Sequence, residues 1–475
     1  MRNDDITAHA MIVRFLAQAA PGDPSVATSM RQRVVGGEIS LDGEDDMERA
    51  LIALAVDAYP ACLLPIRSAL SPEIQNYGPS IGMWLFRHPQ SRVFADAVLN
   101  DDTLQNAFED DRELADETPS MLRNTLDSND LQASLLAELL LQSAWRKLIT
   151  HELTRDAFVA AAVEQLRLVR DVFAGKLRTL TAKFAFTGIL LPPGQKLELS
   201  DGLIRATSEA ERRFVPASLR SKHILRDASG AYPIINNDGD VVLEHALSYK
   251  MQERPFFRPQ VVIPRLAMAQ SIMRLRYSLM LAVKREYRVH LIQTWRAYDV
   301  PLKVGFVLSW DDPQQGPAFR PTQLTSAEAE AWREWYETFK KPHVVKIELA
   351  LTRILRAISE RSDPSDVLID SVIAWENLFG TKEGEPTFRV TMCLAKLLEQ
   401  TPEARVELRT RLAKIYALRS KIVHGGGELR DDEWPRCSEA LEIAIRAVEV
   451  LLTTREDILK LPDGAQRGTT LLLGP

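Results

Sequence analysis

An arginine and a histidine near the carboxyl end of the chain are the residues best suited to do chemistry. Arg419 and His424 lie five residues apart, directly before three glycines at 425–427. Apolar residues recur there at helical spacing, which predicts one helix that the glycines end: Leu408, Leu412, Ile415 and Ile422. Histidine exchanges protons near neutral pH, whereas arginine stays cationic and presents a planar set of donors. The pair therefore suits acid–base chemistry beside an anion.

Arg419 lies on the apolar stripe of its helix, where an unpaired guanidinium is costly. Glu376 is the candidate partner, because it shares one face of a predicted helix with three apolar residues: Ile369, Val372 and Ile373. A carboxylate on a core-facing stripe needs a counter-charge, so we expect a bidentate Glu376–Arg419 pair. The alternative is a purely structural ion pair that fixes the register of a helical bundle.

The Arg-x4-His spacing alone is weak evidence, because it occurs twice more, at Arg146/His151 and Arg285/His290. Neither of those copies is followed by a glycine run. The glycines at 425–427 do not indicate a phosphate-binding loop, since no Gly-Lys-Ser/Thr follows them. We therefore interpret them as the end of the helix.

The elements that would position this pair are helices, expected to form a C-terminal bundle over residues 323–460. Periodicity predicts helices at 326–340, 343–361, 364–379, 386–400, 403–424 and 432–456. Thr325 and Glu328 have the spacing of a capping box for the first of them. Short turns with Gly or Pro separate several of these helices, which favours an antiparallel bundle. We expect residues 461–475 to form a loose tail.

Two regions precede the bundle, and together the three predict an α+β multidomain chain that is predominantly α. Residues 1–178 form an expected helical N-terminal region, with helical apolar spacing at 47–56, 131–148 and 158–173. Residues 179–322 form an expected α+β middle domain with antiparallel strands. An Asn-Asp-Gly-Asp turn at 237–240 predicts a hairpin between the segments on either side of it. A helix at 266–283 is expected to cross this β-rich domain.

Composition places the chain among globular proteins of a reducing cytoplasm. Its 475 residues are 45% hydrophobic and 26% charged, and only three are cysteines, in no disulfide or zinc spacing. No apolar run is long enough to span a membrane, and the polar N-terminus is unlike a signal peptide. Residues 141–300 are basic between two acidic parts. This pattern indicates either an anionic partner or docking within the chain.

Three segments in order, AWENLFG, FRVTMCLAKLL and IYALRSKIVHGG, resemble the HEPN superfamily, most closely its Apea-like branch. The resemblance covers roughly residues 326–456, about a quarter of the chain, and implies that the C-terminal domain is a HEPN-like helical bundle. The strands KFAFTGILLPPG and KLELSDGLIRATSEAE are similar to the region that often precedes this domain. Ribonuclease members of the family carry Arg-x4–6-His.

Carried onto this sequence, the resemblance makes Arg419 and His424 the catalytic pair, with Glu376 in support. Many members have Asn, Asp or His directly after the arginine, whereas this chain has Ser420. We expect Ser420 and Lys421 to contact RNA. The implied activity is a metal-independent endoribonuclease without cofactors, in stress or anti-phage defence. The N-terminal and middle regions would then sense a trigger ligand or protein, or regulate the domain.

Metal-independent RNA cleavage needs a base for the 2′-hydroxyl, an acid for the leaving 5′-oxygen and positive charge on the phosphate. A helix C-terminus favours a cation, so we expect an acid role for His424. Residues five apart on a helix differ by about 140° in direction, so one chain does not easily bring both groups to one phosphate. We therefore expect a homodimer through the C-terminal bundle, as HEPN members often form. The alternative is a non-catalytic HEPN-containing scaffold that binds RNA or protein.

Overall fold

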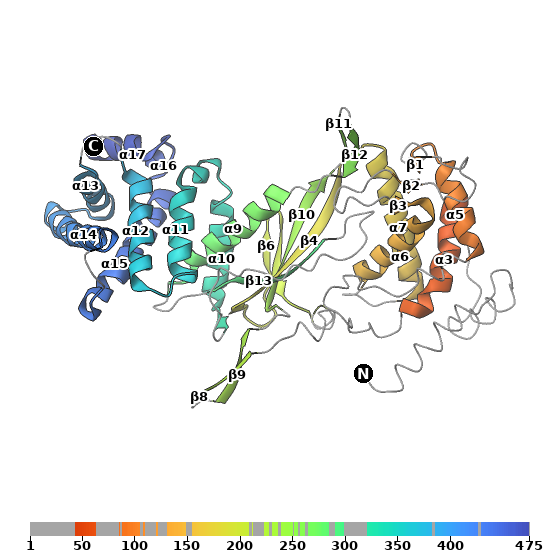
Figure 1. The fold of residues 1–475 in the computed structure, drawn as a ribbon, viewed down its shortest axis with the longest axis horizontal. Coiled ribbons are helices and arrows are strands. Elements are labelled where there is room, and N and C mark those ends of the chain that lie inside the picture. Colours follow the sequence, from red (N-terminus) through yellow and green to blue (C-terminus); the bar gives the residue numbers. More distant parts are fainter. Residues whose placement is uncertain are drawn as a thin grey trace.

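The computed structural model is elongated and predominantly helical, with an antiparallel sheet near its middle (Figure 1). The N-terminal helices lie at one end and the C-terminal helices at the other, in agreement with the expected α+β class. The structure describes residues 43–62, 85, 88–104, 108–109, 120–121, 131–148, 154–208, 211, 223–227, 230–235, 239–249, 251–254, 257–261, 265–284, 290–298, 321–381, 385–425 and 429–474. Among them, no helix is long and apolar enough to cross a membrane.

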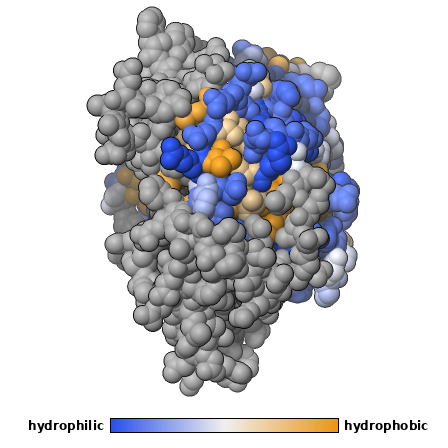
Figure 2. Space-filling view, turned by 90° about the vertical axis from the view of Figure 1, so that its right-hand side faces the viewer, coloured by the Kyte–Doolittle hydropathy of each residue, from blue (hydrophilic) through white to orange (hydrophobic). Residues whose placement is uncertain are grey.

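Four helices and a small three-stranded sheet form the described part of the N-terminal region. They are α3 (Asp46–Cys62), α5 (Pro89–Leu99), α6 (Ala133–Leu148) and α7 (Arg155–Phe173), with β1 (Phe108–Glu109), β2 (Ser120–Met121) and β3 (Leu131–Gln132). One hydrophobic core, which includes Leu54, Phe94 and Phe158, joins all four helices. Periodicity predicted α3, α6 and α7 but not α5, and two-residue strands carry no such signal. Figure 2 shows that the described residues on this end of the molecule present mainly hydrophilic side chains.

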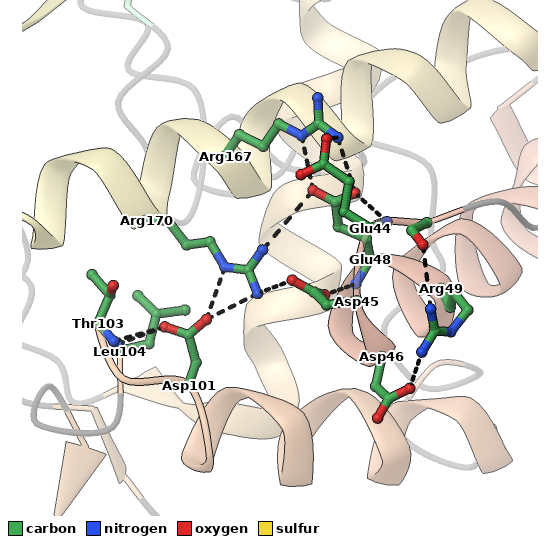
Figure 3. Close-up of polar contacts among 11 residues, drawn as sticks. Glu44, Asp45, Asp46, Glu48, Arg49, Asp101, Thr103, Leu104, Arg167 and Arg170 are labelled. Atoms are coloured by element: carbon green, nitrogen blue, oxygen red, sulfur yellow. Dashed lines mark hydrogen bonds and ion pairs between the residues drawn. The ribbon is translucent and has the colours of Figure 1, made fainter.

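A network of ion pairs ties α7 to the start of α3 and to the loop after α5 (Figure 3). Arg167 Nε donates to Glu48 Oε1 at 2.8 Å, and this hydrogen bond holds the pKa of the buried Glu48 carboxyl below its usual range. Arg170 contacts Asp45 at 2.7 Å and Asp101 at 2.9 Å. The acidic side chains at these positions are therefore structural partners of arginine.

The middle sheet is antiparallel and has the order β13-β4-β10-β7-β6. Its strands are β4 (Arg178–Thr187), β6 (Leu197–Leu199), β7 (Gly202–Ala206), β10 (Val241–Tyr249) and β13 (Ile292–Tyr298). Alternation sets its two faces: Phe184 and Leu243 point into the core, whereas Lys183 and Glu244 pair on the other face at 3.8 Å. Helices α9 (Arg265–Ala282) and α10 (Ser326–Thr338) share the core of the first face.

The hairpin expected around the Asn-Asp-Gly-Asp turn is wrong, because its two strands belong to different sheets. Strand β9 (Gly230–Ile235) pairs with β8 (His223–Asp227), while β4 and β7 occupy the two edges of β10. Asp240 ties the start of β10 to the end of β4, since its carboxylate accepts from Thr187 Oγ1 at 2.7 Å and from Gly188 N at 2.9 Å. Residues 236–238 of the predicted turn lie outside the described residues. The remaining short strands pair as β11 (Met251–Arg254) with β12 (Phe257–Val261) and β5 (Ile189–Leu190) with β14 (Thr322–Gln323).

Helix α9 links the sheet to the C-terminal bundle, because it buries side chains on two sides. Leu275 and Leu279 lie in the sheet core, whereas Met280 and Leu281 lie in the bundle core. Helix α10 also packs on the sheet side, where Trp332 Nε1 donates to the carbonyl of Leu275 at 3.0 Å. The two cores are therefore in direct contact through these helices.

The observed helices of the bundle lie close to the predicted ranges. The observed helices are η2 (Pro342–Ile347), α11 (Glu348–Ser359), α12 (Pro364–Phe379), α13 (Pro386–Leu398), α14 (Pro402–Val423), η3 (Asp431–Glu433) and α15 (Trp434–Thr453), followed by α16 (Glu456–Leu459) and α17 (Gly464–Leu473). The capping box of α10 forms as expected, with Thr325 Oγ1 accepting from Glu328 N at 3.2 Å and Glu328 Oε2 from Thr325 N at 2.8 Å. Proline begins α12, α13 and α14, where its missing N–H costs nothing.

The expected loose tail is wrong, because residues 464–473 form helix α17 against the bundle. Asp463 caps the helix by accepting from Gln466 N at 2.8 Å. Arg467 is only 1% exposed, and it donates to the carbonyls of Leu378 at 2.9 Å and Asn377 at 2.8 Å. Lys396 Nζ donates to the carbonyl of Gly474 at 2.9 Å, at the other end of α17. The segment is thus held by buried polar contacts, which hydrophobic periodicity does not reveal.

Arg467→Met should destabilise the bundle, because it leaves the carbonyls of Asn377 and Leu378 buried without their donor. We expect a loss of about 2–4 kcal/mol in the free energy of unfolding. Urea unfolding followed by far-UV circular dichroism would measure it. Arg446→Met is the matched control, since Arg446 is half exposed and lies 3.6 Å from Glu399, and should cost about 0.5 kcal/mol or less. Equal losses in the two variants would contradict this role of Arg467.

Candidate active site

Helix α14 carries the arginine and ends at the histidine. Thr401 caps its start by accepting from Ala404 N at 3.2 Å, and His424 is its C-cap residue. Gly425 follows with φ of +77°, a left-handed conformation that glycine adopts without strain and that ends the helix. The predicted glycine stop is therefore confirmed at Gly425. Gly426 and Gly427 lie outside the described residues.

Glu376 lies on the last turn of α12 and is 31% exposed, so it is at the edge of the core. The buried face of that helix is formed by other residues, among them Leu368, Val372, Trp375 and Leu378. The expectation that Glu376 lies on the core-facing stripe of this helix is thus wrong. Glu376 lies beside the buried face, displaced from it by part of a helical turn. Its Oε1 atom accepts a hydrogen bond from the hydroxyl of Tyr416, on α14.

Arg419 meets the same carboxylate, but loosely. Its Nη2 atom lies 3.7 Å from Glu376 Oε2, too far for a hydrogen bond, so the expected bidentate pair does not form. The Arg419 side chain is 22% exposed, and its Nε atom is buried with no hydrogen-bond partner among the described residues. Arg419 therefore lies beside a carboxylate without a hydrogen bond to it, and part of its side chain is exposed.

His424 is exposed at the end of α14, and its backbone N–H donates to the carbonyl of Ser420 at 3.1 Å. Its ring makes no hydrogen bond to the described part of the chain. Lys421 lies 3.9 Å from the buried carboxylate of Glu433, in the next helical segment. Ser420 is half buried, so of the two expected RNA contacts Lys421 is the more accessible.

The structure gives Arg419 and His424 different surroundings. Arg419 faces α12 and Glu376, whereas His424 projects from the end of its helix into solvent. The five-residue spacing, about 140° on a helix, accounts for this divergence.

Tyr416 is the site residue that the sequence analysis missed. It lies one helical turn before Arg419 and is nearly buried, at the edge of the bundle core. Burial and the hydrogen bond to Glu376 raise its pKa to about 12, so it stays protonated and donates. Tyr416 follows Leu412 by four residues and precedes Arg419 by three, which places all three on one face of the helix. An aromatic residue at such a position is also typical of a hydrophobic core, so the spacing alone did not identify Tyr416 as a site residue.

Helix α17 braces the end of α12 where Glu376 lies. The two carbonyls that Arg467 binds belong to the residues directly after Glu376, Asn377 and Leu378. Gly464 packs so closely on this turn that a Cβ atom would lie 3.0 Å from the carbonyl oxygen of Asn377. The last turn of α12 is therefore fixed from one side by α17 and from the other by Tyr416.

A second polar cluster, in the middle domain, has a serine beside a histidine and an aspartate. Ser271 Oγ lies 3.0 Å from His245 Nε2, and His245 Nδ1 lies 3.8 Å from Asp201 Oδ2. Ser271 is buried, and its Oγ also lies 3.0 Å from the carbonyl of Ala267, in the preceding turn of its own helix. These contacts fit a structural role for the cluster.

Elsewhere in the described part of the chain, no three His, Cys, Asp or Glu side chains come close enough together to hold a metal ion. Comparison with protein-family models, with curated proteins and with solved structures finds no match to this chain. The interpretation of the site therefore rests on its own residues and geometry.

Double-mutant cycles should separate the two contacts of Glu376. We expect a coupling energy of about 1–2 kcal/mol between Tyr416 and Glu376, because a charged acceptor receives that hydrogen bond. The Arg419–Glu376 coupling should be about 0.5 kcal/mol or less, because that pair is loose and partly exposed. Urea unfolding of Tyr416→Phe, Arg419→Met, Glu376→Ala and the two double variants measures both. A larger coupling for Arg419 than for Tyr416 would show that the ion pair is the stronger contact.

Proposed function

We propose that this protein is a metal-independent endoribonuclease of HEPN type that acts through Arg419 and His424. The observation that carries the proposal is the state of Arg419, which is positioned beside a carboxylate without spending its donors on it. His424 stands open to solvent five residues later, at the point where the helix ends. Phosphate transesterification needs a cationic group for the phosphate oxygens and a side chain that exchanges protons, and these two residues of one helix supply both.

In this mechanism Arg419 donates to the non-bridging oxygens of the scissile phosphate and stabilises the charge that develops there. His424 gives a proton to the leaving 5′-oxygen. The equivalent histidine of a second copy accepts the proton of the attacking 2′-hydroxyl. Glu376 and Tyr416 keep the arginine side chain in place, so they act through Arg419 and do not touch RNA.

The surface beside His424 supports a dimer through the C-terminal bundle. Val423 and Trp434 are each about half exposed, although they are large and apolar. Trp434 follows Glu433, which approaches Lys421 on α14 at 3.9 Å, so these residues border one surface. Apolar side chains around an exposed histidine fit an interface that completes a composite cleft.

We also propose a location and a cellular role for the enzyme. We place it in the cytoplasm, where the three free and buried cysteines would stay reduced. Its role would be stress or anti-phage defence, with the N-terminal and middle regions sensing a trigger ligand or protein. Helices α9 and α10, which join the sheet core to the bundle core, give such a trigger a physical route to the site.

The second candidate is a non-catalytic scaffold of the same type, which binds RNA or protein. The contact of Tyr416 and Arg419 with one carboxylate favours it, because such a cluster also fixes the register of α12 against α14. A scaffold needs Arg419 for stability and has no use for an exposed His424. The two candidates therefore differ in what His424→Ala does.

Cleavage of RNA in excess EDTA tests the proposal. The wild type should cut labelled tRNA or mixed RNA, while His424→Ala and Arg419→Ala should each lower the rate by about 100-fold or more. Gel analysis of the fragments measures it. Lys414→Ala is the control, because Lys414 is an exposed cation on the same helix that should leave the rate unchanged.

A folded His424→Ala that cleaves as fast as the wild type would exclude His424 from the chemistry. If the wild type is inactive in vitro, the same variants are compared in cells challenged with phage. Loss of protection in His424→Ala alone would support the enzyme, and equal protection would support the scaffold.

Sedimentation at micromolar concentration should show a dimer. Trp434→Asp should shift it to a monomer and abolish cleavage, because a charge would be buried at the apolar part of the interface. Val345→Asp is the control, since Val345 is exposed on another part of the bundle and should leave the dimer intact. A wild-type protein that is strictly monomeric at this concentration would contradict the composite cleft.

A further inference from the structure

An exposed aromatic residue stands on the first turn of α13. Phe388 is 52% exposed, whereas four other apolar residues of that helix are buried: Val390, Leu394, Leu397 and Leu398. The ring therefore contributes little to the core of the bundle. The Arg409 guanidinium, on α14, lies over one side of the ring, 5.4 Å from its centroid. Within the part of the chain that the structure describes, Arg409 has no carboxylate partner.

This aromatic residue lies on a helix that packs against α14, the helix of Tyr416 and Arg419. Arg409, over the ring, and Arg419 are ten residues apart on α14, which is about 15 Å along the helix axis. Tyr416 lies between them in the sequence and holds Glu376, which lies beside Arg419. A short RNA strand can therefore reach both the ring and the arginine proposed to hold the phosphate.

We propose that Phe388, together with Arg409, forms a stacking site for one unpaired nucleobase of the RNA whose phosphate Arg419 binds. The inference rests on the proposed function and names a residue that selects single-stranded substrate. Every base has a flat face that stacks on an aromatic ring, and an adjacent cation adds to the attraction. A base within a duplex cannot reach such a ring without leaving its own stack.

The positions of the neighbouring residues favour a base as the occupant. A cationic guanidinium over the ring suits a strand that carries a negative charge at each nucleotide. Val406 is also exposed, and it lies one helical turn before Arg409 on α14. It offers apolar area without a ring and therefore serves as the matched control for stacking.

Binding is best measured apart from cleavage, in the His424→Ala background with EDTA. Fluorescence anisotropy with a labelled single-stranded RNA of about eight nucleotides gives the Kd. Phe388→Ala should weaken binding by about 5- to 150-fold, the range for loss of one stacked base. Phe388→Trp should bind as tightly as the parent, and Val406→Ala should change the Kd less than twofold.

A set of RNAs with one abasic nucleotide at each successive position sharpens the test. For one position of the missing base, the Kd of the abasic RNA for the parent protein should equal the Kd of intact RNA for Phe388→Ala. For that RNA, Phe388→Ala should have no further effect, since ring and base form one contact. An effect of Phe388→Ala that stays equal at every position would overturn the stacking site.

The outcomes keep this inference distinct from the proposed function. A wild-type protein that binds RNA through Phe388 but never cleaves it would refute the endoribonuclease and retain the stacking site. Absence of RNA binding by the parent, or binding that is unchanged in Phe388→Ala, would overturn the stacking site. Conversion of dimer to monomer by Phe388→Ala, seen by sedimentation without RNA, would also overturn it and identify Phe388 as a contact between two copies.

Discussion

The hydrogen bond from the Tyr416 hydroxyl to the Glu376 carboxylate is the contact on which the site depends. It joins α12 to α14 and occupies one carboxylate oxygen, so Arg419 meets only the other oxygen, at 3.7 Å. A closer, bidentate pair would have used the guanidinium for structure. The tyrosine thus supplies the hydrogen bond that joins the two helices, and the arginine makes no hydrogen bond to that carboxylate.

The rest of the bundle keeps that contact in register. Arg467 lies buried beneath the end of α12 and holds the two carbonyls that follow Glu376. Helix α9 buries side chains in both the sheet core and the bundle core. A displacement of the sheet would therefore reach the bundle through packed side chains. Such contact is the physical condition for regulation of the site by the middle region.

The sequence predicted the helices of the bundle because several signals agreed. The ends of α12 and α14 were predicted to within one residue. Each helix has a capping threonine or aspartate, then a proline at its first position, then a stripe of apolar residues. The errors have a common cause. Helix α17 and the pairing of β10 depend on long-range polar contacts, those of Arg467 and Asp240, that leave no local pattern. Periodicity likewise identified the helix that carries Glu376, but it did not show that Glu376 is partly exposed at the edge of the core. It also did not distinguish Tyr416 from an ordinary core residue.

The most direct test compares the cleavage products of two labelled RNA strands. One strand is all ribose, and the other carries a single 2′-deoxynucleotide at the cut position. In EDTA, the account predicts that the all-ribose strand yields a 2′,3′-cyclic phosphate and a 5′-hydroxyl end. The substituted strand should remain intact at that position, because the attacking oxygen is missing. Cleavage of the 2′-deoxy position, or fragments with a 5′-phosphate, would contradict transesterification at Arg419 and His424.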